Sequence, residues 1–177
     1  MKILKPKFWS KKYNLISILL LPISFFLQLF IRLKERFTIQ RNFAIPVICV
    51  GNIYLGGTGK TPLSILIVQE LLKNGKRPAL IKKYYSDHLD EHSLISNNVN
   101  CLFLGKTRSE ALQNAENKGH DIAVLDDGFQ DFTIKKNLNI LCFNSEQLIG
   151  NGLTLPSGPL REKITAIKRA EIIIING

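Results

Sequence analysis

The sequence contains few cysteines and little charge, and each shortage excludes a class of protein. Its three cysteines, Cys49, Cys101 and Cys142, each lie in an apolar run, and none has a near partner or the spacing of metal ligands. We interpret them as reduced core residues of a cytosolic domain. Charged residues make up 21% of the 177 residues and hydrophobic residues 45%, which is typical of a globular chain and not of a disordered one. No internal repeat or low-complexity linker is present.

Acidic residues are also scarce. Fourteen Asp and Glu stand against 24 Lys and Arg, which gives a net charge of +10. This excess predicts an anionic partner, such as a nucleotide, a phospholipid surface or a phosphorylated substrate. The basic residues cluster around an apolar segment near the N-terminus, and this placement argues against nucleic acid.

That apolar segment covers residues 13–31 and contains no charge. Its length is just enough to cross a bilayer, but basic residues flank both of its ends, and no small-residue cleavage site of a signal peptide follows. We predict a membrane-associating segment over residues 1–44, with a helix in the bilayer interface and a kink at Pro22. The alternative is a helix packed on its own domain. On a helix the polar residues would form one narrow stripe: Asn14, Ser17, Ser24, Gln28, Arg32 and Glu35.

From residue 45 onward, short apolar runs alternate with helical patterns. Two helices are expected over residues 62–75 and 107–119. Strands with little polar alternation, separated by helices, indicate an α/β fold with a parallel sheet covered by helices, here over residues 45–177. The final strand has no helix after it, so we expect a C-terminal part to be missing. The six expected strands are residues 46–52, 77–83, 99–105, 121–127, 138–144 and 171–177.

The run GNIYLGGTGKTP, residues 51–62, follows the first expected strand and precedes a helix. A glycine-rich loop in this place is typical of P-loop NTPases, where backbone N–H groups and a helix N-terminus bind phosphates. Lys60 would reach the β- and γ-phosphates of ATP, and the Thr61 hydroxyl would bind Mg²⁺. The strict pattern requires glycine at position 54, where this chain has tyrosine, and the alternative is a simple glycine-rich turn. The predicted ATP-binding residues are Tyr54, Leu55, Gly56, Gly57, Thr58, Gly59, Lys60 and Thr61.

A second motif, IAVLDDGFQD over residues 122–131, is an apolar strand that ends in two acids. P-loop enzymes hold a metal-coordinating carboxylate at such a strand end. Asp126 and Asp127 are therefore predicted to bind Mg²⁺ together with Thr61. The alternative is an Asp-Asp-Gly turn with solvated side chains.

Two further polar stretches follow strands. SDHLDEHSLI, residues 86–95, lacks a single face of metal ligands and is interpreted as a polar loop, although a carboxylate there could act as a base on an attacking hydroxyl. GNGLTLPSGPLRE, residues 150–162, is a loop that ends in Arg161 and Glu162. An arginine in this position could stabilise phosphate charge.

The four motifs, with the LLLP of the N-terminal segment, resemble in order and spacing the tetraacyldisaccharide 4'-kinases, the lipid A kinases of Gram-negative bacteria. This resemblance covers nearly the whole chain. It implies ATP-dependent phosphorylation of the 4'-hydroxyl of a lipid A disaccharide precursor at the cytoplasmic face of the inner membrane. It also implies that Asp90 helps to activate the sugar hydroxyl, and that Lys60, Arg161 and Glu162 are catalytic.

The chain departs from the family's pattern at three places. IKKYYSD stands where the family usually has Ser-Arg-Gly-Tyr-Gly-Arg, and Asp131 stands in place of a histidine. We also expect the family's C-terminal lobe to be missing. Two other interpretations stay open: a membrane-tethered P-loop ATPase or nucleotide switch, and an inactive fragment of a kinase.

Overall fold

A computed structural model describes residues 5–11, 14–85 and 89–177, without the side chains of 89–92. Its centre is a six-stranded sheet in the order β3-β2-β4-β1-β5-β6, and every pairing is parallel. The predicted parallel sheet is confirmed, with all six strands near their expected positions. The strands are β1 Val47–Gly51, β2 Pro78–Lys83, β3 Leu102–Gly105, β4 Ile122–Asp126, β5 Leu138–Asn144 and β6 Ile172–Asn176.

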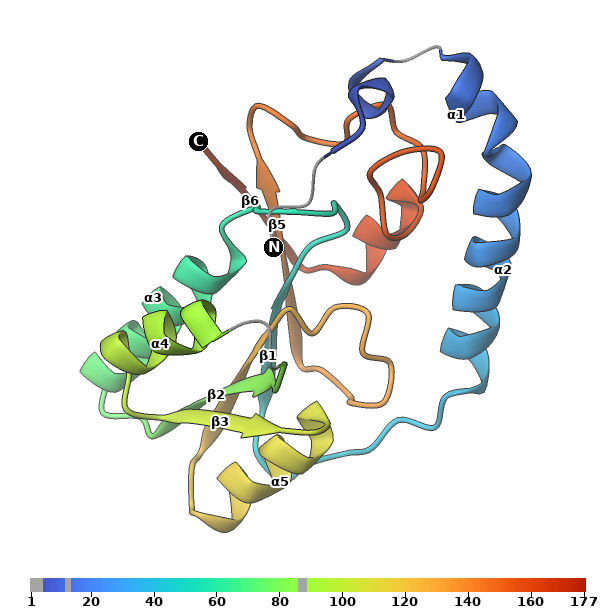
Figure 1. Cartoon of the computed structure of the whole chain (residues 1–177). Helices are drawn as coiled ribbons and strands as arrows, with labels where there is room; N and C mark the ends of the chain where they lie inside the picture. The colour runs from blue at the N-terminus through green and yellow to red at the C-terminus, as the bar shows by residue number, and fades with distance from the viewer. Residues whose placement is uncertain (1–4, 12–13, 86–88) are drawn as a thin grey trace.

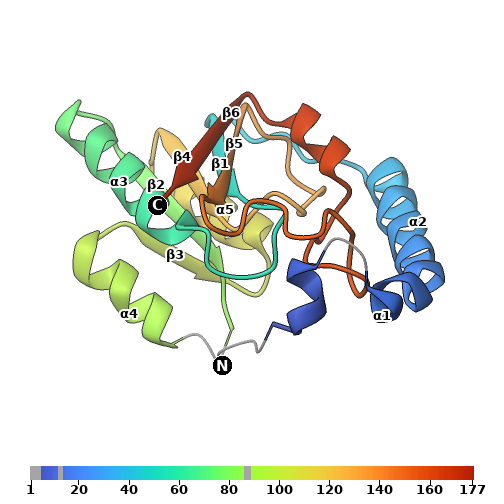
Figure 2. The same cartoon turned by 90° about the horizontal axis from the view of Figure 1, so that it is seen from above.

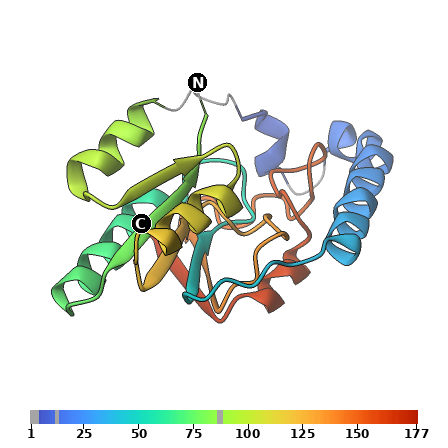
Figure 3. The ribbon, with the colours of Figure 1, turned by 90° about the horizontal axis from the view of Figure 1, so that it is seen from below.

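Helices cover both faces of the sheet (Figures 1 and 3). On one face, α3 (Lys60–Lys73) and α4 (Leu89–Asn98) pack on an apolar cluster that includes Val50, Leu80 and Val124. On the other face, α5 (Arg108–Asn117) and the 3₁₀-helix η3 (Ile164–Arg169) pack on a second cluster. The central strands are therefore covered on both faces, which explains why they are continuous apolar runs without polar alternation.

Helix α4 corrects the prediction of a loop over residues 86–95. Residues 86–88 lie outside the described part, but the chain is helical from Leu89. Ile95 and Val99 are buried in the cluster under α3, so the segment has an apolar anchor at its C-terminal end. It also joins the parallel strands β2 and β3, and such a connection needs a crossover that is usually helical. The many charged residues of the segment led to the prediction of a loop in place of this crossover helix.

The N-terminal segment forms η1 (Lys7–Ser10), α1 (Leu15–Leu19) and α2 (Leu21–Phe37). The prediction of one helix kinked at Pro22 was wrong in detail, because the chain breaks at Leu20 and Pro22 lies in the first turn of α2. A proline is tolerated there because the N–H that it lacks would have no partner within the helix. In every view α2 stands apart from the sheet, with the segment around residues 150–169 between them (Figures 1 and 2).

The polar stripe of α1 and α2 faces the protein. Ser17, Ser24 and Gln28 are buried, whereas the apolar residues of the same helices are exposed. The polar stripe packs on the domain, as the alternative had it. Across the described residues, no helix is long and apolar enough to cross a membrane. The exposed apolar residues include Leu15, Leu19, Ile23, Phe25, Phe26, Leu29, Phe30, Leu33 and Phe37.

Candidate active site

Strands β1 and β4 lie side by side, and the glycine loop and the Asp-Asp pair leave them at the same edge of the sheet. The loop closes through left-handed backbone at Gly56 (φ 125°) and Gly59 (φ 77°), and α3 begins at Lys60. Among the described residues, no protein acceptor takes the N–H groups of residues 56–61. A row of free donors at a helix N-terminus is an arrangement suited to an anion.

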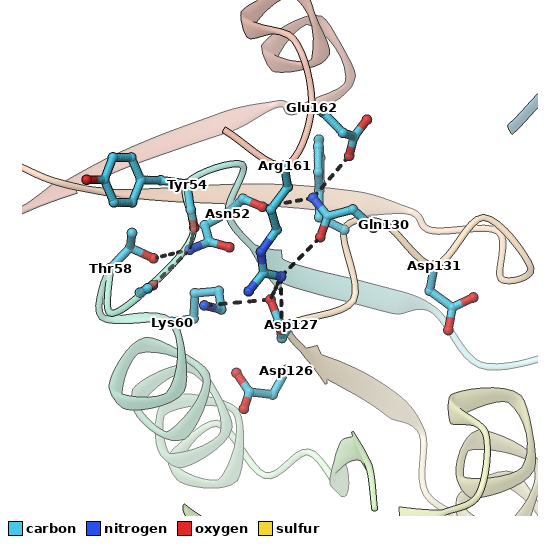
Figure 4. Close-up of polar contacts among 12 residues, drawn as sticks. Asn52, Tyr54, Thr58, Lys60, Asp126, Asp127, Gln130, Asp131, Arg161 and Glu162 are labelled. Atoms are coloured by element: carbon cyan, nitrogen blue, oxygen red, sulfur yellow. Dashed lines mark hydrogen bonds and ion pairs between the residues drawn. The ribbon is translucent and has the colours of Figure 1, made fainter. Parts of the chain in front are cut away.

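Asn52 fixes the shape of the loop from behind (Figure 4). Its buried Nδ2 donates to the Tyr54 carbonyl at 2.7 Å, to the Gly56 carbonyl at 3.2 Å and to Thr58 Oγ1 at 2.9 Å. Because the carbonyls turn toward Asn52, the loop N–H groups remain free for a ligand. The sequence analysis assigned no role to Asn52, although it lies at the start of the loop motif.

Tyr54 occupies the position where the strict motif has glycine. Its ring is buried, lies 4.7 Å from Lys5 Nζ, and points away from Lys60 (Figure 4). The tyrosine side chain therefore does not fill the space beside Lys60, and the missing glycine is compatible with an open loop.

Asp126 is fully buried at the end of β4. It accepts hydrogen bonds from Thr61 Oγ1 at 3.0 Å and from Ser64 Oγ at 3.3 Å, and its Oδ2 lies 2.6 Å from Lys82 Nζ. A hydroxyl at the start of the loop helix beside a strand-end carboxylate is the pair that holds Mg²⁺ in P-loop NTPases. The donor set of Thr61 and Asp126 thus fits the predicted metal. In the described part of the chain, no group of three His, Cys, Asp or Glu residues has the geometry of a metal site.

Asp127 lies next to Asp126 but faces a different set of groups (Figure 4). Arg161 Nη1 donates to its two carboxylate oxygens at 3.0 and 3.2 Å, and Lys60 Nζ lies 3.6 Å away. Burial alone would raise the pKa of the Asp127 carboxyl, but Lys60 and Arg161 outweigh it and lower that pKa. The structure thus brings together Lys60, Asp127 and Arg161, three residues that come from three separate motifs.

Glu162 is nearly buried and contacts Gln130 Nε2 at 3.0 Å and Arg169. Burial raises the pKa of its carboxyl, and Arg169 and Gln130 offset only part of this effect. Gln130 also donates to the Asn52 carbonyl at 2.9 Å, so it links the glycine loop to Glu162. Within the described residues, Glu162 has no hydrogen bond or ion pair with Lys60 or Asp127, and its predicted catalytic role stays a prediction.

Asp90 lies in the first turn of α4, and its side chain is outside the described part. The predicted base is therefore untested. Asp131, which departs from the family's pattern, lies 3.6 Å from Arg108, and Arg108 donates to the Asp127 carbonyl at 2.7 Å. Neither Lys82 nor Arg108 was assigned a role from the sequence. The available signal for Lys82 was a lysine directly after the apolar run of β2, at the strand end where the site lies.

The comparisons with known proteins agree on one family. The family described as LpxK, tetraacyldisaccharide-1-P 4'-kinase, matches residues 16–177. A tetraacyldisaccharide 4'-kinase from Pelagibacter ubique is 50% identical over the whole chain, which covers 56% of that relative. One from Gluconobacter oxydans is 33% identical, with 97% of this chain and 58% of the relative covered. The chain thus spans somewhat more than half the length of these relatives.

Solved structures give the same result. A crystal structure of LpxK from Aquifex aeolicus, reported in complex with ATP, matches with a TM-score of 0.78 and 26% identity, over 92% of this chain and 59% of that one. The signal recognition particle receptor FtsY from Elizabethkingia anophelis matches with a TM-score of 0.53 at 13% identity, which concerns the fold alone.

Proposed function

The chain belongs to the tetraacyldisaccharide 4'-kinase family, and on that premise we propose that it is the Mg-ATP-binding part of a kinase that phosphorylates a lipid A disaccharide precursor. The observation that carries the proposal is the convergence of Lys60, Asp127 and Arg161 beside the free N–H groups of the loop.

Each group has a distinct task in phosphoryl transfer, which depends mainly on positioning and electrostatics. The loop N–H groups and Lys60 would bind the β- and γ-phosphates. Thr61 and Asp126 would hold Mg²⁺, which neutralises charge on the phosphates when it is bound. Arg161 would offset the charge that develops on the transferred group. Asp127 keeps Lys60 and Arg161 directed at the same point.

Asp90 is proposed as the group that orients or deprotonates the 4'-hydroxyl of the acceptor. It follows β2, and β2 ends at the same edge of the sheet as the glycine loop and the Asp-Asp pair. The acceptor is the tetraacylated disaccharide 1-phosphate that the family's name implies.

The exposed apolar face of α1 and α2 is proposed to lie on the cytoplasmic face of the inner membrane. Phe25, Phe26 and Phe30 are each more than 60% exposed, and exposed apolar patches of this kind mark surfaces that bind a partner or a membrane. Arg32, Lys34 and Arg36 near the end of α2 would add attraction to anionic lipids.

Nucleotide affinity tests the binding part of the proposal. Lys60→Ala should weaken ATP binding about 10- to 100-fold, because it removes a charge-assisted contact to phosphate. Lys73→Ala is the matched control, because Lys73 lies at the other end of the same helix and pairs only with the exposed Glu70. Equal ATP affinity in wild type and Lys60→Ala would contradict the phosphate-binding role of the loop.

The transfer step needs a chain extended with the C-terminal part of a relative, because this chain covers 56% of the Pelagibacter protein. With radiolabelled ATP and the tetraacyldisaccharide, Asp90→Ala should lower turnover about 10²- to 10⁴-fold and leave ATP affinity nearly unchanged. Nucleotide binding without any transfer to lipid would instead favour a membrane-tethered ATPase or nucleotide switch.

A further inference from the structure

We propose that Gln28, in the middle of α2, is a positioning residue for Arg161. The buried face of α2 would then help to position a phosphate-binding residue, in addition to attaching the exposed apolar face to the domain. This inference rests on the proposed function, because it assumes that Arg161 contacts a nucleotide phosphate.

Gln28 uses both ends of its side-chain amide on the segment that carries Arg161. Nε2 donates to the Arg161 carbonyl at 3.0 Å, and Oε1 accepts from the Lys163 N–H at 3.2 Å. The side chain is nearly buried, with 5% exposure. A single amide thus fixes two peptide groups on either side of Glu162, much as a neighbouring strand would.

The other side of the Arg161 peptide is held by the glycine-loop region. The Arg161 N–H donates to the Ile53 carbonyl at 2.7 Å, and Leu160 forms an isolated bridge with Tyr54. Arg161 is therefore fixed on its amide side by the chain after β1 and on its carbonyl side by α2. From this position its guanidinium reaches the Asp127 carboxylate (Figure 4).

Two further contacts tie α2 to the same segment. Ser24 Oγ donates to the Thr154 carbonyl at 3.0 Å and accepts from the Ser157 N–H at 3.1 Å. About two helical turns beyond Gln28, Glu35 pairs with Arg169, and Arg169 also pairs with Glu162. These contacts dock the helix, but among the described residues of α2 only Gln28 hydrogen-bonds to the Arg161 carbonyl.

The loss of Gln28 should weaken binding of the γ-phosphate and leave binding of the other phosphates nearly unchanged. An arginine has a long side chain, so the position of the Arg161 guanidinium depends on how firmly its backbone is held as well as on its contact with Asp127. If Gln28 acts merely as a partner for buried backbone groups, its loss should affect folding stability alone. If it positions Arg161, its loss should reduce the preference for ATP over ADP, because the loop N–H groups and Lys60 still hold the phosphates that the two nucleotides share.

The test measures ATP and ADP affinities for wild type, Gln28→Ala and Gln28→Glu. Gln28→Glu retains the acceptor for the Lys163 N–H but replaces the donor to the Arg161 carbonyl with an oxygen. We expect both variants to lose about 10-fold in ATP affinity, to change in ADP affinity by less than about twofold, and to bind phospholipid vesicles like wild type. Gln69→Ala is the matched control, because Gln69 Nε2 donates to the Asn98 carbonyl on the other side of the sheet.

A double-mutant cycle with Arg161→Ala keeps the test decisive where a single variant is poorly folded. In the Arg161→Ala background, Gln28→Ala should have no further effect on the ATP-to-ADP ratio. Equal losses for ATP and ADP, no loss at all, or additive effects in the cycle would overturn the proposal. A wild-type chain that fails to bind ATP would instead contradict the proposed function, and this result is distinguishable from the other three.

Discussion

The sheet and the N-terminal helices use polar and apolar side chains in opposite ways. In the sheet region, Leu112 and Val68 are fully buried, and Glu70, Lys73 and Glu110 on the outer sides of α3 and α5 are exposed. In α1 and α2, Leu19 is 77% exposed and Phe26 68% exposed, while Ser24 and Gln28 are inside. Both regions form regular helices, so secondary structure does not distinguish them.

The difference follows from what each region packs against. Helices α3 and α5 cover strands whose backbone groups are already paired, so only apolar side chains are needed at that contact. Helix α2 covers the irregular segment 150–163, which presents carbonyls and N–H groups without partners in a ladder. Ser24 and Gln28 satisfy these groups. The polar residues of α2 therefore face the protein, and its apolar residues face outward.

The largest effect is expected from reversing the polarity of the exposed face. Replacement of Phe25, Phe26 and Phe30 by serine should reduce binding to vesicles of phosphatidylethanolamine and phosphatidylglycerol by about 10³-fold or more, because each buried phenylalanine contributes about 1.5–3 kcal/mol. ATP affinity should not change. The double variant Leu66→Ser and Leu72→Ser, at exposed positions of α3, is the control and should bind vesicles like wild type. Vesicle binding that survives the triple substitution would contradict a membrane contact of this face.

A second experiment compares one substitution in the two regions. Leu112→Ala in α5 should lower the free energy of unfolding by about 2–5 kcal/mol, because it leaves a cavity in a dry core. Leu19→Ala in α1 should change it by less than about 0.5 kcal/mol, because the side chain is already exposed. Urea unfolding of both variants measures the difference. Similar losses would indicate that α1 is covered in solution, for example by a second copy of the chain.

The smallest effect concerns Glu162, which lies where the two regions meet. Burial raises the pKa of its carboxyl in the folded chain above the unfolded value of about 4.3. The folded state therefore binds this proton more tightly, and the stabilisation is complete below about pH 4 and is lost as pH rises through the folded pKa. Glu162→Gln should remove this part of the pH dependence of unfolding, whereas Glu70→Gln, at an exposed pair on α3, should not. An unchanged pH profile in Glu162→Gln would exclude the shift.

Elements of the fold could be predicted from the sequence where the apolar pattern and the order of elements along the chain indicate the same structure. The six strands are recognisable because each is an apolar run, and the central ones are buried on both faces. The glycine loop marks the end of β1. Helix α4 was missed because its charged first turn resembles a loop. Its buried residue Ile95 comes late in the helix, and the buried Val99 follows just after its end. The stripe along α2 was found by periodicity, but periodicity cannot say which face meets the protein.

The candidate site was predictable where a motif carries the chemistry. Lys60, Thr61, Asp126 and Arg161 do converge, although their motifs are far apart in the chain. Lys82, Arg108 and Gln28 were not assigned, because their importance depends on partners that only the fold brings near. Asn52 lies in a recognised motif, yet its contact with three groups of the loop depends on a loop conformation that spacing alone does not define.

One contact at the edge of the sheet has a consequence for how the chain folds during its synthesis. Asn176 Nδ2, at the end of β6, donates to the Thr58 carbonyl at 2.8 Å across a separation of 118 residues. At about 5–20 residues per second, a ribosome needs about 6–24 s to add the residues between these two partners. During that interval the nascent glycine loop lacks one of its hydrogen bonds, so the loop gains this contact only after β6 has left the ribosome.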